Sequence, residues 1–138
     1  MAFAVTREVP PPLVDALPTL PDTPGLAGAF AGVHNGHLLA GGGANFPGGR
    51  MPWDGGTKVW HDRVRVLAPD AGSTWRWLGR LPAPNAYGVS VTAAEGVLVI
   101  GGGNAVRSVA DVWLMTFDGA SLAFRALPPL PTPLAQMA

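Results

Sequence analysis

Side chains that could do chemistry are few in this chain, and several familiar kinds of site lack a required residue. The absence of cysteine excludes disulfides, thiolate metal sites and a cysteine nucleophile within the chain. His34 and His37 could act as paired metal ligands, but no third ligand lies nearby and the two flank Asn35-Gly36, a strong hairpin signal. No G-x-S-x-G elbow is present to support a serine hydrolase. We therefore expect no metal site, and judge the remaining polar residues from the elements that position them.

Two glycine triplets, Gly41–Gly43 and Gly101–Gly103, have the composition of a phosphate-binding loop. A phosphate loop needs a following helix and a Lys-Ser or Lys-Thr pair, and neither is present. Each triplet instead follows a short apolar run, and the two are about 60 residues apart. We interpret the triplets as repeated points where strands approach closely.

The elements that carry these residues are predicted to be short strands. Apolar, β-forming runs alternate with Gly, Pro, Asn and Asp, no stretch shows a helical period over ten residues, and prolines interrupt most helix candidates. The chain is therefore predicted to be all-β. The predicted strands are 27–34, 37–42, 63–67, 74–81, 88–93, 97–102, 111–117 and 122–127.

An internal repeat organises these strands. Trp75-x-x-Leu78-x-x-Leu81-Pro82 recurs as Phe124-x-x-Leu127-x-x-Leu130-Pro131 about 49 residues later. The glycine triplets have a longer spacing because the first copy carries an inserted loop, Asn45–Asp62. Without the insertion a single period of about 49 residues remains, which is typical of a four-stranded propeller blade.

The repeat predicts a division of the chain into parts of a β-propeller. Residues 1–21 are the expected end of a closing blade, 22–84 a blade with the long loop 45–62, 85–133 a second blade, and 134–138 the start of a third. Two blades cannot close a ring. We therefore expect further blades of a longer chain to complete it, or identical copies of this chain to associate.

Composition narrows the class of partner. The chain has 138 residues, nine basic and nine acidic side chains, 48% hydrophobic residues and only 13% charged residues. A zero net charge without a basic cluster argues against nucleic-acid and membrane partners. The N-terminus has no secretion-signal pattern and no run is long enough to span a membrane. A cytoplasmic location is favoured, and a periplasmic one stays open.

The repeated unit resembles the kelch repeat, in which a double glycine after an apolar strand is followed by an aromatic residue in each of the next two strands. The second unit has Gly101-Gly102, Trp113 and Phe124. The first has Gly41-Gly42 and Trp75, but Arg65 stands where the third-strand aromatic is expected. The resemblance implies a kelch-type β-propeller, of which this chain would hold about two four-stranded blades of an expected six.

Longer motifs make the resemblance more specific. The segments 24–32, 41–47, 51–56 and 58–62, followed by Asn85-Ala86-Tyr87-Gly88, are similar to those of the kelch-type sialic-acid mutarotases, the N-acetylneuraminate epimerases and their cyclically permuted relatives. The resemblance covers most of the chain from about residue 17. It implies interconversion of the α and β anomers of N-acetylneuraminate, a small sugar acid, with no metal or organic cofactor.

The resemblance also suggests which residues contact the sugar. In such propellers the loop after the second strand and the Leu-Pro connection between blades emerge on one face, so the insertion and the segment 85–87 should meet at one pocket. A guanidinium such as that of Arg50 can bind a carboxylate with two hydrogen bonds. The side chains expected to pack on the sugar or bind its hydroxyl groups are Trp53, Trp60, Asn45, Asn85, Tyr87 and Asn104.

Mutarotation calls for an acid and a base. The candidates are His61, Asp54 and Tyr87. A structural role is favoured for His61, where the insertion re-enters the third strand, and for Asp54, which precedes Gly55-Gly56 as turn residues often do. The catalytic pair is therefore unassigned, and blades outside this chain could supply it.

The alternative function is a kelch module without catalytic activity that binds protein or carbohydrate through the same loop face. A fold alone does not decide between the two, because one fold hosts many activities. An insertion rich in Trp, Gly and Pro suits a lined small-molecule pocket better than a flat protein-binding rim. This favours the mutarotase interpretation.

Overall fold

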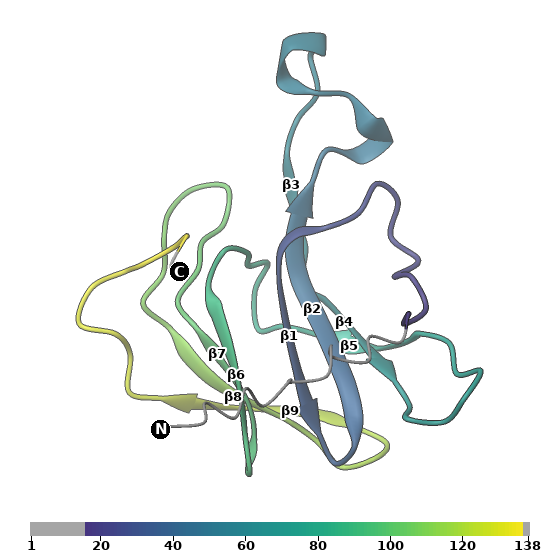
Figure 1. Ribbon diagram of the computed structural model, residues 1–138. Coiled ribbons are helices and arrows are strands. Elements are labelled where there is room, and N and C mark those ends of the chain that lie inside the picture. The colour runs from purple at the N-terminus through teal and green to yellow at the C-terminus, as the bar shows by residue number, and fades with distance from the viewer. Residues whose placement is uncertain (1–15, 137–138) are drawn as a thin grey trace, which may run out of the picture.

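In the computed structural model, which describes residues 16–136, two antiparallel sheets pack face to face (Figure 1). The first contains β1 (Ala27–His34), β2 (His37–Asn45), β4 (Arg63–Leu67) and β5 (Arg76–Arg80) in that order, and the short β3 (Val59–Trp60) pairs with β2. The second contains β6 (Val89–Ala93), β7 (Gly96–Ile100), β8 (Val112–Phe117) and β9 (Leu122–Leu127), also in chain order. The predicted all-β class is confirmed, and each sheet contains the four predicted strands, to which β3 adds a fifth in the first sheet.

Helical structure within the described residues is limited to two short 3₁₀ turns in the inserted loop, Pro47–Gly49 and Pro52–Asp54. The described chain has no helix with the length and apolar character needed to cross a membrane. Figure 1 shows the loop that carries the 3₁₀ turns and β3 extending beyond the body of the first sheet.

The core lies between the two sheets. Alternate residues of neighbouring strands point to the same face, so one face of each sheet supplies the buried side chains. The fully buried side chains are Phe30, Leu39, Val64 and Val66 from the first sheet and Val97, Val99, Met115 and Phe117 from the second. Gly32 of β1 allows the close approach, because a Cβ there would lie 2.6 Å from Val97 Cγ1.

The edge of β1 is joined to the second sheet by side-chain hydrogen bonds. Ser90 Oγ accepts from the Ala31 N–H and Thr92 Oγ1 from the Val33 N–H, both at 3.0 Å. These bonds satisfy backbone donors that an edge strand would otherwise leave unpaired. The two blades are therefore joined by polar contacts as well as by the core.

His34 and His37 hold the β1–β2 hairpin in place. His34 Nδ1 accepts a hydrogen bond from the Phe117 N–H at 2.9 Å, and His37 Nδ1 lies 2.8 Å from the Asn35 carbonyl oxygen. The His37 ring also meets the Phe117 ring edge-on, with centroids 5.1 Å apart. Both imidazoles are thus engaged in packing the hairpin against β8.

The repeat is visible in the backbone hydrogen bonds at the loop end of each sheet. The His61 N–H donates to Gly43 O at 2.9 Å, and the Val109 N–H donates to Gly102 O at 2.8 Å in the second blade. The Gly43 N–H likewise donates to Asn85 O, as the Gly102 N–H does to Leu134 O. Each blade therefore closes onto the connection that leads to the next one.

These bonds correct the alignment of the two glycine triplets by one residue. The sequence aligned Gly41 with Gly101, whereas the strand register pairs Phe30 with Gly41 and, in the second blade, Val89 with Ile100. The left-handed positions agree with the structural alignment: φ is 67° at Gly42 and 59° at Gly101. The glycine pair needed for the fold is therefore Gly42-Gly43 in the first blade, and Gly41 continues the strand.

Candidate functional site

The predicted meeting of the insertion with the blade connection takes the form of an open groove of about 460 Å³. Residues 24–27 form one side, the start and end of the insertion form another, and Tyr87 comes from the connection. Four polar or flexible side chains line it: Asn45, Met51, Lys58 and Tyr87. Two of the residues expected to bind the sugar, Asn45 and Tyr87, are thus brought together.

Tyr87 enters the groove from a strained backbone. Its φ is +64°, in the left-handed region that bulky residues rarely adopt. Two hydrogen bonds hold it there: its N–H donates to Gly28 O at 2.9 Å, and its carbonyl accepts from the Gln136 N–H at 2.6 Å. A left-handed conformation costs roughly 1–2 kcal/mol. Such strain persists where the surrounding structure enforces it, which is often at a functional site.

Asn45 and His61 form a pair at the base of the insertion. Asn45 Nδ2 donates to the Pro24 carbonyl at 2.9 Å, which orients the amide so that its Oδ1 faces His61 Nε2 at 2.8 Å. His61 therefore donates its Nε2 proton to Asn45 and supports the groove from behind. Its ring also lines a small cavity with Asp22 and Arg65, so it does not face the groove directly.

Arg50, Trp53 and Asp54 lie together in the outer part of the insertion. Arg50 Nη2 donates to the Asp54 carbonyl at 2.6 Å, and these three residues are exposed, with Trp53 at 78%. None of the three lines the groove. The loop tip is held by its own hydrogen bonds, including those of the 3₁₀ turn that begins at Pro52.

Asn85 and Asn104 lie apart from the groove, at the junction between the blades. Asn85 Nδ2 donates to Gly101 O at 2.9 Å, and Asn104 Oδ1 accepts from the Val106 and Arg107 N–H groups. Both residues line a separate small cavity beside the Leu81-Pro82 turn. Asn85 Oδ1 is buried without a hydrogen-bond partner in the described residues, and lies 2.4 Å from where a Cβ on Gly102 would stand.

Lys58 is the residue that sequence reasoning missed. Its Nζ lies 4.4 Å from the centroid of the Tyr87 ring and 5.2 Å from that of the Trp60 ring. Trp60, another residue expected to bind the sugar, therefore lies next to Lys58 but does not itself line the groove. The available signal was that Lys58 is the only lysine of the chain and stands in the insertion.

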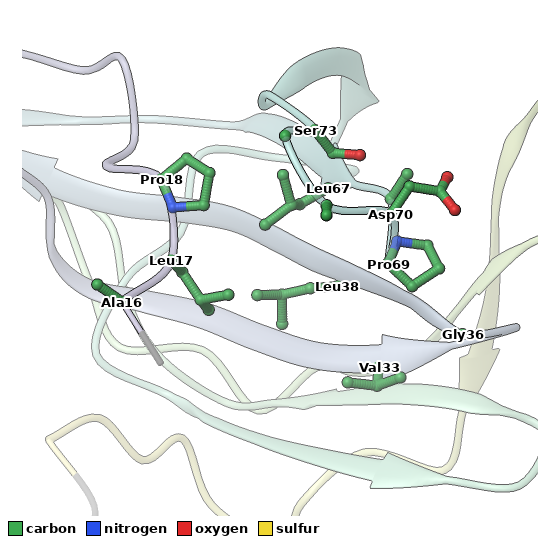
Figure 2. A pocket seen from close by; sticks show the side chains of 13 residues that line it. Ala16, Leu17, Pro18, Val33, Gly36, Leu38, Leu67, Pro69, Asp70 and Ser73 are labelled. Carbon is green, nitrogen blue, oxygen red and sulfur yellow. The ribbon is translucent and has the colours of Figure 1, made fainter. Parts of the chain in front are cut away.

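A second hollow in the described residues is larger than this groove but contains none of the predicted site residues. Figure 2 shows it between the segment that carries Leu17 and Pro18 and the sheet residues Leu38 and Leu67. Its volume is about 730 Å³. Its lining is mainly apolar, and it lies beside the hairpin turns, including the β1–β2 turn at Gly36. Its polar side chains, Asp70 and Ser73, come from a single turn, whereas those of the groove at Tyr87 converge from separate segments, which suits a sugar site better.

The fold and its repeated glycine turns define a class of protein: the chain forms about two blades of a kelch-type β-propeller, the ring of which is expected to have six. Comparison with known proteins specifies the family. The family model for N-acetylneuraminate epimerase matches residues 12–124. The chain belongs to the N-acetylneuraminate epimerase family.

Individual relatives agree with this assignment. The chain is 41% identical over 110 residues to the N-acetylneuraminate epimerase of Salmonella enteritidis, covering 73% of this chain and 28% of the relative. It is 39% identical over 123 residues to the N-acetylneuraminate epimerase of Haemophilus influenzae, covering 75% and 31%. The solved structure of YjhT aligns with a TM-score of 0.69 and 29% identity, over 79% of this chain and 33% of that one. The chain thus spans about a third of the length of these relatives or less.

Proposed function

We propose that the propeller containing these two blades interconverts the α and β anomers of N-acetylneuraminate, and that the groove at Tyr87 forms part of its sugar site. Membership of the epimerase family supports the reaction. The location of the sugar site is supported by the convergence of Asn45, Lys58 and Tyr87, from two separate segments, on one open groove. A sugar acid with hydroxyl groups suits this mixture of amide, ammonium and aromatic side chains.

The proposed reaction proceeds through the open-chain sugar. A base removes the proton of the anomeric hydroxyl group, the bond between the anomeric carbon and the ring oxygen breaks, and an acid protonates the ring oxygen. The resulting ketone closes again when the same oxygen attacks its other face, with the proton transfers reversed. The scheme requires only proton transfers and a rotation about one carbon–carbon bond, without a metal or organic cofactor.

Among the three acid–base candidates we assign the proton transfer on this side of the sugar to Tyr87. Tyr87 is the only one of the three that lines the groove. His61 directs its Nε2 proton to Asn45, and Asp54 belongs to the exposed loop tip. The second proton-transfer group would come from blades outside this chain. Trp53 and Arg50 would meet the sugar only where it extends beyond the groove toward the loop tip.

The test is the approach to anomeric equilibrium of freshly dissolved β-N-acetylneuraminate, followed by NMR in the presence of the protein. We expect catalysis in the complete propeller, and a loss of about 100-fold or more in Tyr87→Phe because a positioned acid or base contributes that much. Sugar binding should survive, since the ring remains. An unchanged rate in Tyr87→Phe would refute the role of Tyr87. Binding without any catalysis by the unmodified protein would instead establish the alternative, a carbohydrate-binding kelch module.

A further inference from the structure

Lys58 has surroundings that differ from those of the other cationic side chains in the described residues. Its ammonium group lies over the Tyr87 ring at 4.4 Å and beside the Trp60 ring at 5.2 Å, a geometry suited to cation–π attraction. No carboxylate pairs with it in residues 16–136, where the ion pairs are Arg65–Asp22 and Arg80–Asp62. It is half-buried and is the charged residue of the groove lining.

The backbone on both sides of the groove positions the residues that make this contact. Lys58 directly precedes β3, where Val59 pairs with Asn45 and Trp60 with Ala44. Opposite, the left-handed conformation of Tyr87 sets the direction of its ring. Two aromatic faces therefore hold the cation without neutralising it, and its N–H donors stay available to an anion in the groove.

Arg50, the cation expected from the sequence to bind the carboxylate, is engaged elsewhere. Its Nη2 donates to the Asp54 carbonyl at 2.6 Å, and its side chain is not part of the groove lining. A planar guanidinium used in this way stabilises the loop tip. The charge in the groove is that of Lys58.

We propose that Lys58 binds the carboxylate of the ligand and makes this groove select sugar acids over neutral sugars. The identity of the sugar in this inference rests on the proposed function, whereas the existence of an anion site does not. An uncompensated, half-buried ammonium gains more from a carboxylate than an exposed one does, because the surroundings screen the attraction less than bulk water. The neighbouring amide of Asn45 can still accept or donate through its free lone pair and second N–H.

The first test compares the binding of N-acetylneuraminate with that of its methyl ester, which lacks the charge. In Lys58→Gln we expect affinity for the acid to fall about 10- to 100-fold and affinity for the ester to stay within about twofold, since a charged hydrogen bond is lost only with the acid. Arg107→Gln, in the turn after Asn104, is the matched control and should leave both affinities unchanged. A loss of acid selectivity in Arg50→Gln with none in Lys58→Gln would overturn the proposal.

The second test needs no substitution and therefore does not depend on a variant folding. Reductive methylation with ¹³C-formaldehyde labels Lys58 and the N-terminal amine of the 138-residue chain, which gives two NMR signals. The signal of the N-terminal amine is identified by its titration at about pH 8, and the other signal is that of Lys58. The Lys58 signal should shift saturably with N-acetylneuraminate and not with its methyl ester. If neither sugar shifts it, glucuronate and glucose distinguish the causes. A response to glucuronate alone keeps the anion site and refutes the sialic-acid substrate, whereas no response to any carboxylate overturns the site.

Discussion

Arg65 stands on β4 where the second blade has Trp113 on β8, and its side chain has a different partner. The two residues occupy matching positions, since Arg65 pairs with Ala40 and Trp113 with Val99. Arg65 donates two hydrogen bonds to Asp22, Nε at 2.8 Å and Nη2 at 2.9 Å, and both side chains are largely buried. The ion pair fastens the segment before β1 to the outer face of the first sheet, in place of aromatic packing.

This ion pair predicts a pH-dependent stability. The hydrogen bonds from Arg65 hold the pKa of the Asp22 carboxyl below its ordinary value of 3.8. The contribution of the pair is therefore fully present above about pH 5 and lost as the pH falls through the lowered pKa in the folded protein. We expect Asp22→Asn to destabilise the chain by about 1–3 kcal/mol at pH 7 and to flatten the acid side of its stability curve. Urea unfolding between pH 3 and 7 measures both effects, and an unchanged acid slope in Asp22→Asn would contradict this account.

Gly42 illustrates the constraint that the repeated turn places on a single residue. Its φ is +67°, and a Cβ there would lie 2.4 Å from Asn85 O and 2.9 Å from Leu81 Cδ1. Gly72, in the β4–β5 turn, also has a positive φ, +80°, but nothing lies within 4 Å of its Cβ position.

Comparing substitutions at Gly42 and Gly72 separates the cost of a steric clash from the cost of a left-handed backbone. We expect Gly72→Ala to lower the free energy of unfolding by about 1 kcal/mol, which is the cost of placing an alanine in the left-handed conformation. Gly42→Ala should cost several times more, because the clash is with backbone of the neighbouring connection and displaces Asn85. Thermal unfolding of the two variants compares them directly. Equal losses would show that the contact with Asn85 relaxes freely.

At the scale of elements, the blades are joined through the edge of β1. The hydroxyl groups of Ser90 and Thr92 on β6 accept hydrogen bonds from the backbone N–H groups of Ala31 and Val33, on the edge of β1 that faces away from β2. Because β1 and β6 are each the first, edge strand of their sheets, these bonds join the edge of one blade to the edge of the next.

Removing one of these hydroxyl groups should loosen the joint between the blades. Thr92→Val keeps the shape of the side chain and leaves the Val33 N–H without its acceptor. We therefore expect the free energy of unfolding to fall by about 1 kcal/mol. Thr116→Val on β8 is the matched control, since the Thr116 hydroxyl forms no hydrogen bond within the described residues. Hydrogen exchange at the Val33 amide should accelerate only in Thr92→Val. Unchanged protection there would show that packing alone holds the joint.

At the scale of the whole molecule, each sheet has one face in the shared core and one facing away. Trp77 and Val33 on the outer side of the first sheet are 63% and 46% exposed, and Val91 on the second is 43% exposed. Two blades cover only one interface, whereas every blade of a closed propeller has a neighbour on both faces. We propose that further blades, in the same chain or in other copies, cover these faces.

The 138-residue chain by itself should therefore self-associate or aggregate. Light scattering gives the mass in solution: a species of about 43 kDa, three times 14.2 kDa, would mean that three chains close a six-bladed ring. Aggregates larger than this would be expected if the outer faces associate without closing. A monodisperse monomer with a sharp, cooperative thermal transition would refute the prediction.

Most of the fold was predictable because it depends on local patterns. Short apolar runs bounded by Gly, Pro and Asn specify strands and turns within a few residues, so all eight main strands were placed correctly. The two-residue β3 was missed, since its pairing with Asn45 depends on how the insertion returns to the sheet. The glycine triplets were aligned one residue out of register because three identical letters carry no information about which two adopt a positive φ.

The sequence by itself determined the class, the repeat and the family, because strand periodicity, turn residues and motif spacing are properties of short segments. Tertiary structure alone decided which polar residues share a site. It brings Asn45, Lys58 and Tyr87 to one groove, leaves Arg50 bonded within its own loop, and uses Asn85 between the blades. The direction of each side chain depends on backbone angles such as that of Tyr87, which contacts between distant segments impose. Residue type indicates which chemistry is available, and the packing of one blade against the next decides where it can occur.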